Sequence, residues 1–347
     1  MALRDRISAL LSPAWRARAA RAERRLQGWV SRVGPARALA RRAHLPLALR
    51  RPGQVGLEVT SACNARCIMC PRHEMDRPMR PMDLGLFRKV VDECADLGVP
   101  EIALNGYGDI FTLTHGRYRD YIGYVRERAP AAHVVINTNG QGMDEEAARY
   151  LVASGVHAVH TDIDGATAPT FERIREHLSL AQVEANVLRL VRRRDAAGKR
   201  RPAVRVGIIT MPQNRHEIPQ FLAKWRGRVD CVEVDGLANR VPGIDPSLML
   251  NQGRPCYELW SKLQIWANGH AVLCCEDWNG THVVGDARTQ SIGEIWTGGP
   301  LQSARPHHLA GTARSIAMCR NCNAWRPGPY WWFDDWGPAP EPGGPAA

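Results

Sequence analysis

The 347-residue chain lacks the signals that carry a protein into or across a membrane. No run approaches the roughly 18 to 20 uninterrupted apolar residues that span a bilayer. The first residues also lack a short apolar run followed by a small-residue cleavage site, so secretion is not expected. We therefore expect a cytoplasmic protein whose ten cysteines serve metal or redox chemistry rather than disulfide bonds.

Lysine is absent from residues 1–52, although this leader holds thirteen arginines against only Asp5 and Glu23, a net charge of +11. The rest of the chain has 33 basic and 33 acidic residues and is neutral. Apolar residues recur among the arginines at roughly helical spacing. The predicted helix either lies on an anionic membrane surface or an acidic partner, or packs one side on the body of the protein. No nucleic-acid partner is expected, because the neutral part has no basic surface or aromatic module.

Strand-like and helix-like segments alternate from residue 55 to about residue 240. The predicted strands are 55–60, 101–109 (a strand that runs into a glycine turn), 133–140, 158–165, 203–210 and 230–237. The predicted helices between them are 84–98, 117–128, 144–154, 180–198 and 215–226. This alternation predicts an α/β fold with a parallel sheet. Six such units fit a doubly wound sheet or a partial (β/α) barrel, and both bind ligands at the C-terminal ends of the strands.

Polar residues, glycines and cysteines follow the first four predicted strands at that end, so we expect them to face one shared mouth. They are Cys63, Cys67 and Cys70 after the first strand; Asn105, Gly106, Gly108 and Asp109 after the second; Asn137 and Asn139 after the third; Asp162 and Asp164 after the fourth.

The first set, in "TSACNARCIMCP", has the spacing C-x3-C-x2-C and no fourth cysteine nearby. Thiolates are soft ligands that suit iron–sulfur clusters, and three of them on a cubane leave one iron free for a small molecule. From residue 55 to about 240 the chain resembles the radical S-adenosylmethionine (SAM) superfamily. The resemblance implies a partial (β/α)6 barrel and a [4Fe–4S] cluster on Cys63, Cys67 and Cys70 whose open iron binds SAM. It also implies one-electron cleavage of SAM to methionine and a 5′-deoxyadenosyl radical.

The same resemblance implies further contacts with SAM. In "NGYGD", Asn105, Gly106, Gly108 and Asp109 match the turn that binds the SAM amino group, although Asp109 replaces the usual Glu. Asn137 and Asn139 match the strand end near the ribose. Asp162, where Ser is common, and Arg175 match the segment near the ribose and carboxylate. Met69 holds the position that covers the adenine.

A second cysteine set, Cys256, Cys274, Cys319 and Cys322, has the arrangement C-x12-G-x4-C followed by C-x2-C. It resembles the twitch extension, a shortened SPASM domain, and implies a second [4Fe–4S] cluster, fully ligated, for electron transfer. By spacing alone, a zinc ribbon with four cysteines is the alternative. The predicted parts are therefore a basic leader (1–52), the barrel (53–245), the twitch domain (246–330) and a Trp-rich, then Pro- and Gly-rich tail (331–347).

The resemblance implies a radical SAM oxidoreductase or epimerase acting on a sugar-like or other small polar substrate, as in antibiotic biosynthesis, with a flavodoxin- or ferredoxin-type reductant. The alternatives are modification of a peptide or protein, and action on a lipid-linked glycan at the membrane through the basic leader. Cys275 is the candidate hydrogen donor for epimerisation, and Asp235 and Arg240 are the candidate substrate contacts. His160 and Glu233 are further polar residues near the mouth.

Overall fold

The computed structural model describes residues 48–236 and 255–320, together with 322 and 324. Within these residues one mixed sheet has the strand order β11-β10-β9-β1-β3-β4-β5-β7-β8. The strands are β1 (Gln54–Leu57), β3 (Glu101–Leu104), β4 (His133–Thr138), β5 (Ala158–Asp162), β7 (Ala203–Thr210), β8 (Cys231–Gly236), β9 (Lys262–Ile265), β10 (His270–Val272) and β11 (Val283–Asp286).

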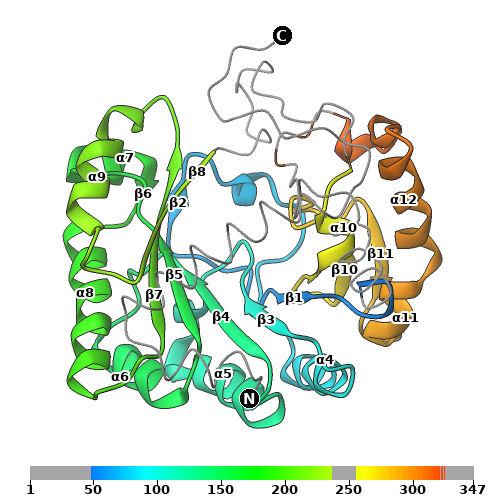
Figure 1. Ribbon diagram of the computed structural model, residues 1–347, viewed down its shortest axis with the longest axis horizontal. Helices are drawn as coiled ribbons and strands as arrows, with labels where there is room; N and C mark the ends of the chain where they lie inside the picture. The colour runs from blue at the N-terminus through cyan, green and yellow to red at the C-terminus, as the bar shows by residue number, and fades with distance from the viewer. Residues whose placement is uncertain (1–47, 237–254, 321, 323, 325–347) are drawn as a thin grey trace, which may run out of the picture.

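Strands β1, β3, β4, β5, β7 and β8 pair in parallel, because a helix returns the chain after each of β1, β3, β4, β5 and β7. These helices are α4 (Leu84–Asp96), α5 (Tyr118–Arg128), α6 (Glu145–Ser154), α7 (Ala168–Ile174) with α8 (Leu180–Ala196), and α9 (Ile218–Trp225). They cover the outer side of a curved, open sheet (Figure 1). This is the predicted partial barrel, and the α/β prediction is confirmed.

Alternation along the strands gives the sheet two different faces. Apolar side chains of alternate residues point at the helices and are fully buried, among them Leu57, Ile136, Val159 and Val206. Helix starts are fixed locally: the Asp83 side chain accepts a hydrogen bond from the Leu86 amide, which caps α4. The outer layer is therefore the hydrophobic core, and the inner face is left for polar residues.

The C-terminal region continues the same sheet. Strand β9 pairs in parallel with β1, with Gln54 opposite Lys262 and Leu57 opposite Ile265. Strands β10 and β11 then follow in antiparallel order. The helices here are α10 (Glu258–Ser261), α11 (Ile292–Thr297) and α12 (Gly299–Leu309). Lys89 of α4 donates to the Ala287 carbonyl at 2.9 Å, so this region is fastened to the first helix as well as to the first strand.

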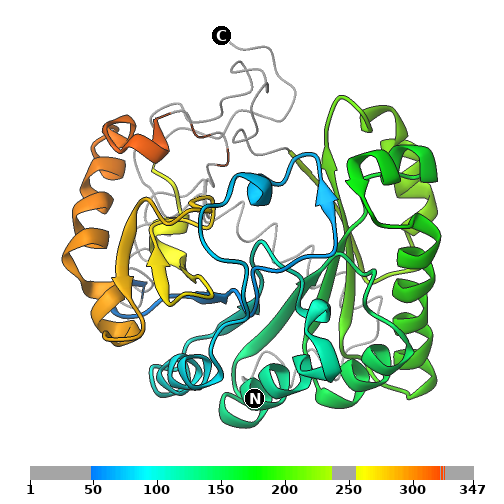
Figure 2. The same cartoon turned by 180° about the vertical axis from the view of Figure 1, so that it is seen from behind.

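The segment between β1 and α4 crosses the opening between the two halves of the sheet (Figure 2). It carries β2 (Arg66–Cys67), which pairs antiparallel with β6 (Arg175–Glu176), and a short 3-10 turn at Pro71–Glu74. Nearly all of the predicted leader, the boundary at 245/246 and the tail lie outside the described residues, so the domain limits stay predictions. No helix in the described ranges combines the length and the apolar character needed to cross a membrane.

Candidate active site

The loop that carries Cys63, Cys67 and Cys70 is anchored at its middle. Cys67 lies opposite Arg175 in the β2–β6 pair. The Ile68 amide donates to the Ile174 carbonyl at 2.9 Å, and the Cys70 amide donates to the Cys67 carbonyl at 3.1 Å. The cysteines therefore lie against the segment predicted to contact SAM, although more than a hundred residues separate them in the chain.

These three thiols have the chemistry of a cluster site. Burial raises the pKa of all three; the pKa of Cys67 is about 11, because burial, with smaller contributions from Cys70 and Cys63, outweighs the charge of Arg175. A soft metal ion that displaces the thiol protons would remove the free-energy cost of deprotonating these buried thiols. Cys63 Sγ also has two nearby donors, the Ala65 amide at 3.5 Å and Asn139 Nδ2 at 3.6 Å. Such hydrogen bonds stabilise a thiolate and tune a cluster. The residues fit a [4Fe–4S] cluster.

The "NGYGD" turn is packed tightly against this loop. The Asp109 amide donates to the Ala62 carbonyl at 2.9 Å. A Cβ atom on Gly108 would lie 2.0 Å from the Thr60 carbonyl oxygen, and one on Gly106 would lie 2.5 Å from Glu58 Cγ. The Asn105 amide is bonded to the Leu57 carbonyl at 3.0 Å. Both glycines are therefore required by close approach of the turn to the chain that leads to Cys63.

Replacing Gly108 by alanine should displace the turn and weaken SAM binding about fivefold or more, since overpacking against backbone costs about 1–3 kcal/mol. The dissociation constant for SAM can be measured by calorimetry on anaerobically reconstituted protein. Gly299→Ala is the matched control, because nothing lies within 4 Å of its Cβ position. Unchanged affinity in the Gly108 variant would show that this turn does not form the SAM site.

Asp109 is buried, and its carboxylate is hydrogen-bonded within this chain. Its carboxylate is 3% exposed and accepts from the Phe111 amide at 2.9 Å, Thr138 Oγ1 at 2.8 Å and the Asn139 amide at 2.7 Å. Burial raises its pKa in spite of these bonds. These bonds tie the turn to the end of β4, and the contact of Asp109 with the SAM amino group stays a prediction.

Asn139 is turned towards the cysteine loop. Its Nδ2 donates to Asn64 Oδ1 at 2.7 Å besides approaching Cys63 Sγ. Asn137, two residues earlier, is exposed on the inner face of the sheet. Met69 is half-buried in the loop and packs against the core. Of the three, Asn137 has the position expected of a residue open to a ligand at the mouth.

Arg175 is buried between two carboxylates of the β5 end. Its Nε and Nη2 both lie 2.7 Å from Asp164 Oδ2, and Nη2 lies 3.5 Å from Asp162 Oδ2. Asp164 Oδ1 in turn accepts from the Ile209 amide at 2.7 Å. The guanidinium is thus held rigidly beside Cys67, and a SAM carboxylate would meet a charge that is already shared with two acids.

A charged cluster occupies the inner face of β5, β7 and β8. His160 Nε2 lies 2.9 Å from Asp162 Oδ1, and His160 Nδ1 lies 3.6 Å from Glu233 Oε2. The space for this pair comes from Gly207, where a Cβ would be 2.7 Å from both Asp162 Oδ1 and His160 Nε2. Burial alone would raise the pKa of Asp162, but the His160 hydrogen bond and the Arg175 charge lower it. The inner face thus offers donors and acceptors to a polar ligand.

Sequence reasoning missed a buried ion pair that joins the two halves. Glu58, directly after β1, is fully buried and is bonded by both terminal nitrogens of Arg77. It also accepts from the Tyr107 amide at 3.0 Å and the Ala267 amide at 3.1 Å. Arg77 donates to the Trp278 carbonyl and lies over the Trp266 ring. The only sign of this ion pair in the sequence is an acidic residue, Glu58, at the end of an apolar strand.

The cysteines of the second set belong to the C-terminal region. Cys256 and Cys319 are buried, and Cys274 and Cys322 are half-buried. The Cys322 amide donates to the Cys319 carbonyl at 3.4 Å. In the described ranges no group of three His, Cys, Asp or Glu side chains could hold a single metal ion. The set therefore stays a predicted cluster site, with donors of the soft type that iron–sulfur clusters use.

Cys275 touches both halves of the site. Its side chain neighbours Cys274 and is the largest cause, ahead of burial, of the raised pKa of Cys274. Its carbonyl accepts from the Tyr107 hydroxyl at 3.0 Å. Asp235 is exposed at the end of β8, and Arg240 lies outside the described residues. The two predicted catalytic residues that the structure describes, Cys275 and Asp235, therefore lie in opposite halves of the sheet, after β10 and in β8.

Comparison with known proteins assigns both regions. The sequence profile of the radical SAM superfamily matches residues 57–224, and that of an iron–sulfur cluster-binding domain, SPASM, matches residues 256–323. The tungsten-containing aldehyde ferredoxin oxidoreductase cofactor-modifying protein of Pyrococcus furiosus is 29% identical over 168 residues, 48% of this chain and 46% of that protein. The chain thus spans about half the length of that relative. The S-adenosyl-L-methionine-dependent 2-deoxy-scyllo-inosamine dehydrogenase of Niallia circulans is 22% identical over 271 residues, 78% of this chain and 92% of the dehydrogenase.

Solved structures agree on the fold. BtrN in complex with AdoMet and 2-DOIA aligns with a TM-score of 0.54 at 20% identity, over 78% of this chain and 93% of BtrN. Streptococcus suis SuiB bound to S-adenosylmethionine aligns with a TM-score of 0.59 at 12% identity, over 73% and 67%. The two matched domains imply [4Fe–4S] clusters and SAM as cofactors. The cysteine loop, the glycine turn beside it and the sheet that carries both place this chain in the radical SAM superfamily, as a member with a C-terminal SPASM-type cluster domain.

Proposed function

We propose that this radical SAM enzyme oxidises an alcohol of a sugar-like or other small polar substrate. The similarity to the inosamine dehydrogenase over most of both chains supports this reaction class. The observation that carries the proposal is the charged inner face of β5, β7 and β8. SAM and its cluster, once bound, supply the radical that removes hydrogen from the carbinol carbon. Every other task falls to side chains: binding hydroxyl groups, orienting the carbon and accepting the hydroxyl proton.

His160 is the proposed acceptor of that proton. It stands on the inner face between Asp162 and Glu233, which would stabilise the imidazolium that forms. Arg205, its neighbour across the β5–β7 register, opposes that effect. Asn137 lies on its other side in the β4–β5 register and could bind a substrate hydroxyl. Asp235, exposed in β8, and Arg240, outside the described residues, remain proposed substrate contacts.

Dehydrogenation is preferred to epimerisation because of Cys275. Epimerisation needs a thiol that can return a hydrogen atom to the substrate. The Cys275 thiol instead lies beside Cys274, a proposed cluster ligand. The proposed cluster on Cys256, Cys274, Cys319 and Cys322 would accept the electron left on the substrate. A flavodoxin- or ferredoxin-type protein is the proposed reductant. Membrane contact through residues 1–52 remains a proposal, and nearly all of that leader lies outside the described residues.

The reaction can be tested in deuterium oxide with SAM, dithionite and a panel of aminocyclitols and sugars. Dehydrogenation should give one ketone per 5′-deoxyadenosine and leave no solvent deuterium at the reacting carbon. Epimerisation would place one deuterium at an inverted carbon, because a thiol exchanges its hydrogen with solvent. That result would overturn the dehydrogenase proposal. Product formation only with peptides would overturn the substrate class.

The pH dependence tests His160 directly. Burial lowers its pKa, but the Asp162 hydrogen bond and the charges of Asp162 and Glu233 raise it above its ordinary value, against Arg205. A base must be neutral, so oxidation should increase as pH rises through this pKa. Glu233→Gln removes one anion and destabilises the imidazolium, so the acidic limb of the pH–rate profile should move to lower pH. Glu127→Gln, an exposed change on α5, should leave the limb in place. An unmoved limb in the Glu233 variant would exclude His160 as the base.

A further inference from the structure

The outer surface beside the cysteine loop holds a cavity of about 650 Å³ whose rim carries Arg80, Arg117 and Arg288, and we call it the basic groove. We propose that the basic groove is the docking site of a small acidic electron-carrier protein that reduces the cluster on Cys63, Cys67 and Cys70. This proposal rests on the radical SAM assignment, which requires an electron, and not on the identity of the substrate.

The wall of the groove runs directly beside the chain that leads to Cys63. Pro81 forms an antiparallel bridge with Thr60. The Ser61 amide donates to the Arg80 carbonyl at 3.1 Å, and the Met82 amide donates to the Val59 carbonyl at 2.8 Å. Ser61 is two residues before Cys63 in the sequence. A partner in the groove would therefore be separated from this part of the cluster loop by the thickness of one extended segment.

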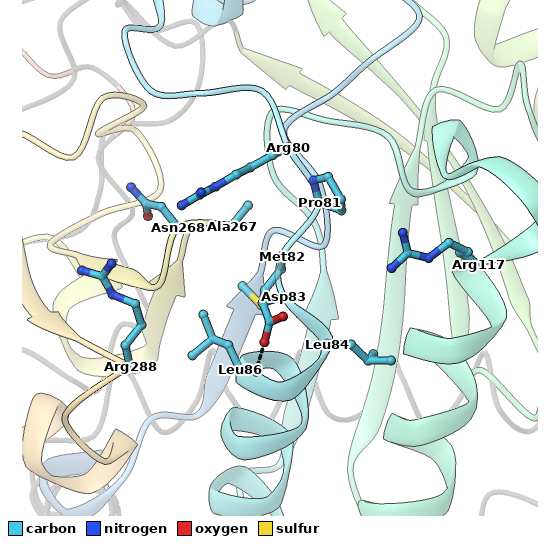
Figure 3. Close-up of a pocket in the computed structure, with 10 residues that line it drawn as sticks. All are labelled: Arg80, Pro81, Met82, Asp83, Leu84, Leu86, Arg117, Ala267, Asn268 and Arg288. Carbon is cyan, nitrogen blue, oxygen red and sulfur yellow. Dashed lines mark hydrogen bonds between the residues drawn. The ribbon is translucent and has the colours of Figure 1, made fainter.

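The opposite wall comes from the C-terminal region. Ala267 and Asn268 line it, and the Ala267 amide is bonded to Glu58 at 3.1 Å. Figure 3 shows Arg80 reaching towards Asn268, while Arg117 lies on the other side of the first turn of α4. The groove thus opens at the junction of the two matched domains, where one partner can contact both without reaching the inner face used by substrate.

The charge of the groove selects an acidic partner. Arg288 is paired with Asp286, whereas within the described residues no ion pair is found for Arg80 or Arg117. Both are exposed. Asp83 is the only acid of the lining, and its Oδ1 accepts from the Leu86 amide at 2.9 Å. The excess is positive, so complementary charge would speed association with an acidic protein.

The proposed step transfers one electron. The carrier's reduced flavin or iron–sulfur centre loses one electron and the cluster gains it, and no atom or proton passes between the proteins. Dithionite can supply the same electron by diffusion and needs no docking surface. The ratio of carrier-driven to dithionite-driven SAM cleavage therefore isolates the docking step from the chemistry that follows.

The test uses the full reconstituted chain with the double variant Arg80→Glu and Arg117→Glu. A purified acidic flavodoxin with its reductase is the carrier, and 5′-deoxyadenosine is the readout. The ratio of the two rates should fall on the order of tenfold at low ionic strength, because like charges then face each other. The deficit should shrink as salt is added. Flavodoxin binding, titrated by fluorescence, should weaken in parallel.

The control is the double variant Arg173→Glu and Arg192→Glu, two exposed arginines of α7 and α8 that undergo the same change of charge. It should keep the wild-type ratio and affinity. An unchanged ratio in the groove variant, or an equal loss in the control, would overturn the proposal. Failure of dithionite itself to drive SAM cleavage in the wild-type chain would count against the radical SAM chemistry and not against the groove.

Discussion

Replacing Cys67 by alanine is expected to abolish SAM cleavage. A cubane held by three thiolates has no spare protein ligand, so removal of one should release the cluster. Iron should fall from about eight to about four atoms per chain if both proposed clusters form. The measurements are iron and sulfide content and 5′-deoxyadenosine formed with dithionite after anaerobic reconstitution.

Cys94→Ala is the control for the loss of a thiol. Cys94 is fully buried in α4, and nothing in the described structure brings it to the cysteine loop. It should keep the full iron content and SAM cleavage, with a modest loss of stability from the small cavity. Formation of 5′-deoxyadenosine by the Cys67 variant at the wild-type rate would contradict the assignment of the cluster to Cys63, Cys67 and Cys70.

Replacing Arg77 by methionine should destabilise the protein by about 3–5 kcal/mol, because it leaves the Glu58 carboxylate buried without its partner. Glu58 is fully buried, and its remaining donors are the amides of Tyr107 and Ala267. Chemical denaturation of the reconstituted protein, followed by circular dichroism, measures the loss. Replacing both members, Glu58→Gln with Arg77→Met, should cost less than the single change, since no uncompensated charge remains.

The matched control is Arg119→Met. Arg119 pairs with Glu146, but both side chains are substantially exposed, so water replaces the lost partner and little stability should change. Equal effects of the two substitutions would mean that Glu58 is hydrated in solution. Because Glu58 is bonded to the turn at Tyr107, the Arg77 variant should also bind SAM more weakly at temperatures where it stays folded.

The central sheet could be predicted because its strands are apolar runs rich in β-branched residues. "AVRVGIIT" gave the bounds of β7 correctly, at Ala203–Thr210. Within 101–109, predicted as a strand that runs into a glycine turn, β3 ends at Leu104, before the first glycine. Beyond that residue the Asn105 amide still bonds to Leu57, but the two glycines turn the chain away. Strand starts follow from local hydrophobicity, whereas strand ends depend on which neighbour is still available for pairing.

Two features of the site could not be predicted from local sequence. The β2–β6 pair that sets Cys67 against Arg175 contains two residues on each side, too few for any periodicity. The partners of Asp109 and Arg175 are likewise determined by tertiary packing: resemblance identified both positions but not the groups that would bind them. Asp109 is bonded to Thr138 and Asn139, and Arg175 to Asp164. Both residues thereby hold the site together.

The parallel pairing of β9 with β1 affects how the chain can be engineered. Removing the C-terminal region would uncover one edge of β1, with the unpaired amides and carbonyls of Gln54–Leu57. An exposed edge of this kind invites pairing with another copy and aggregation. The cluster-binding region therefore cannot be exchanged as an independent module. A chimaera between relatives should keep β1 and β9 from the same parent, and a truncated barrel should need a replacement strand at that edge.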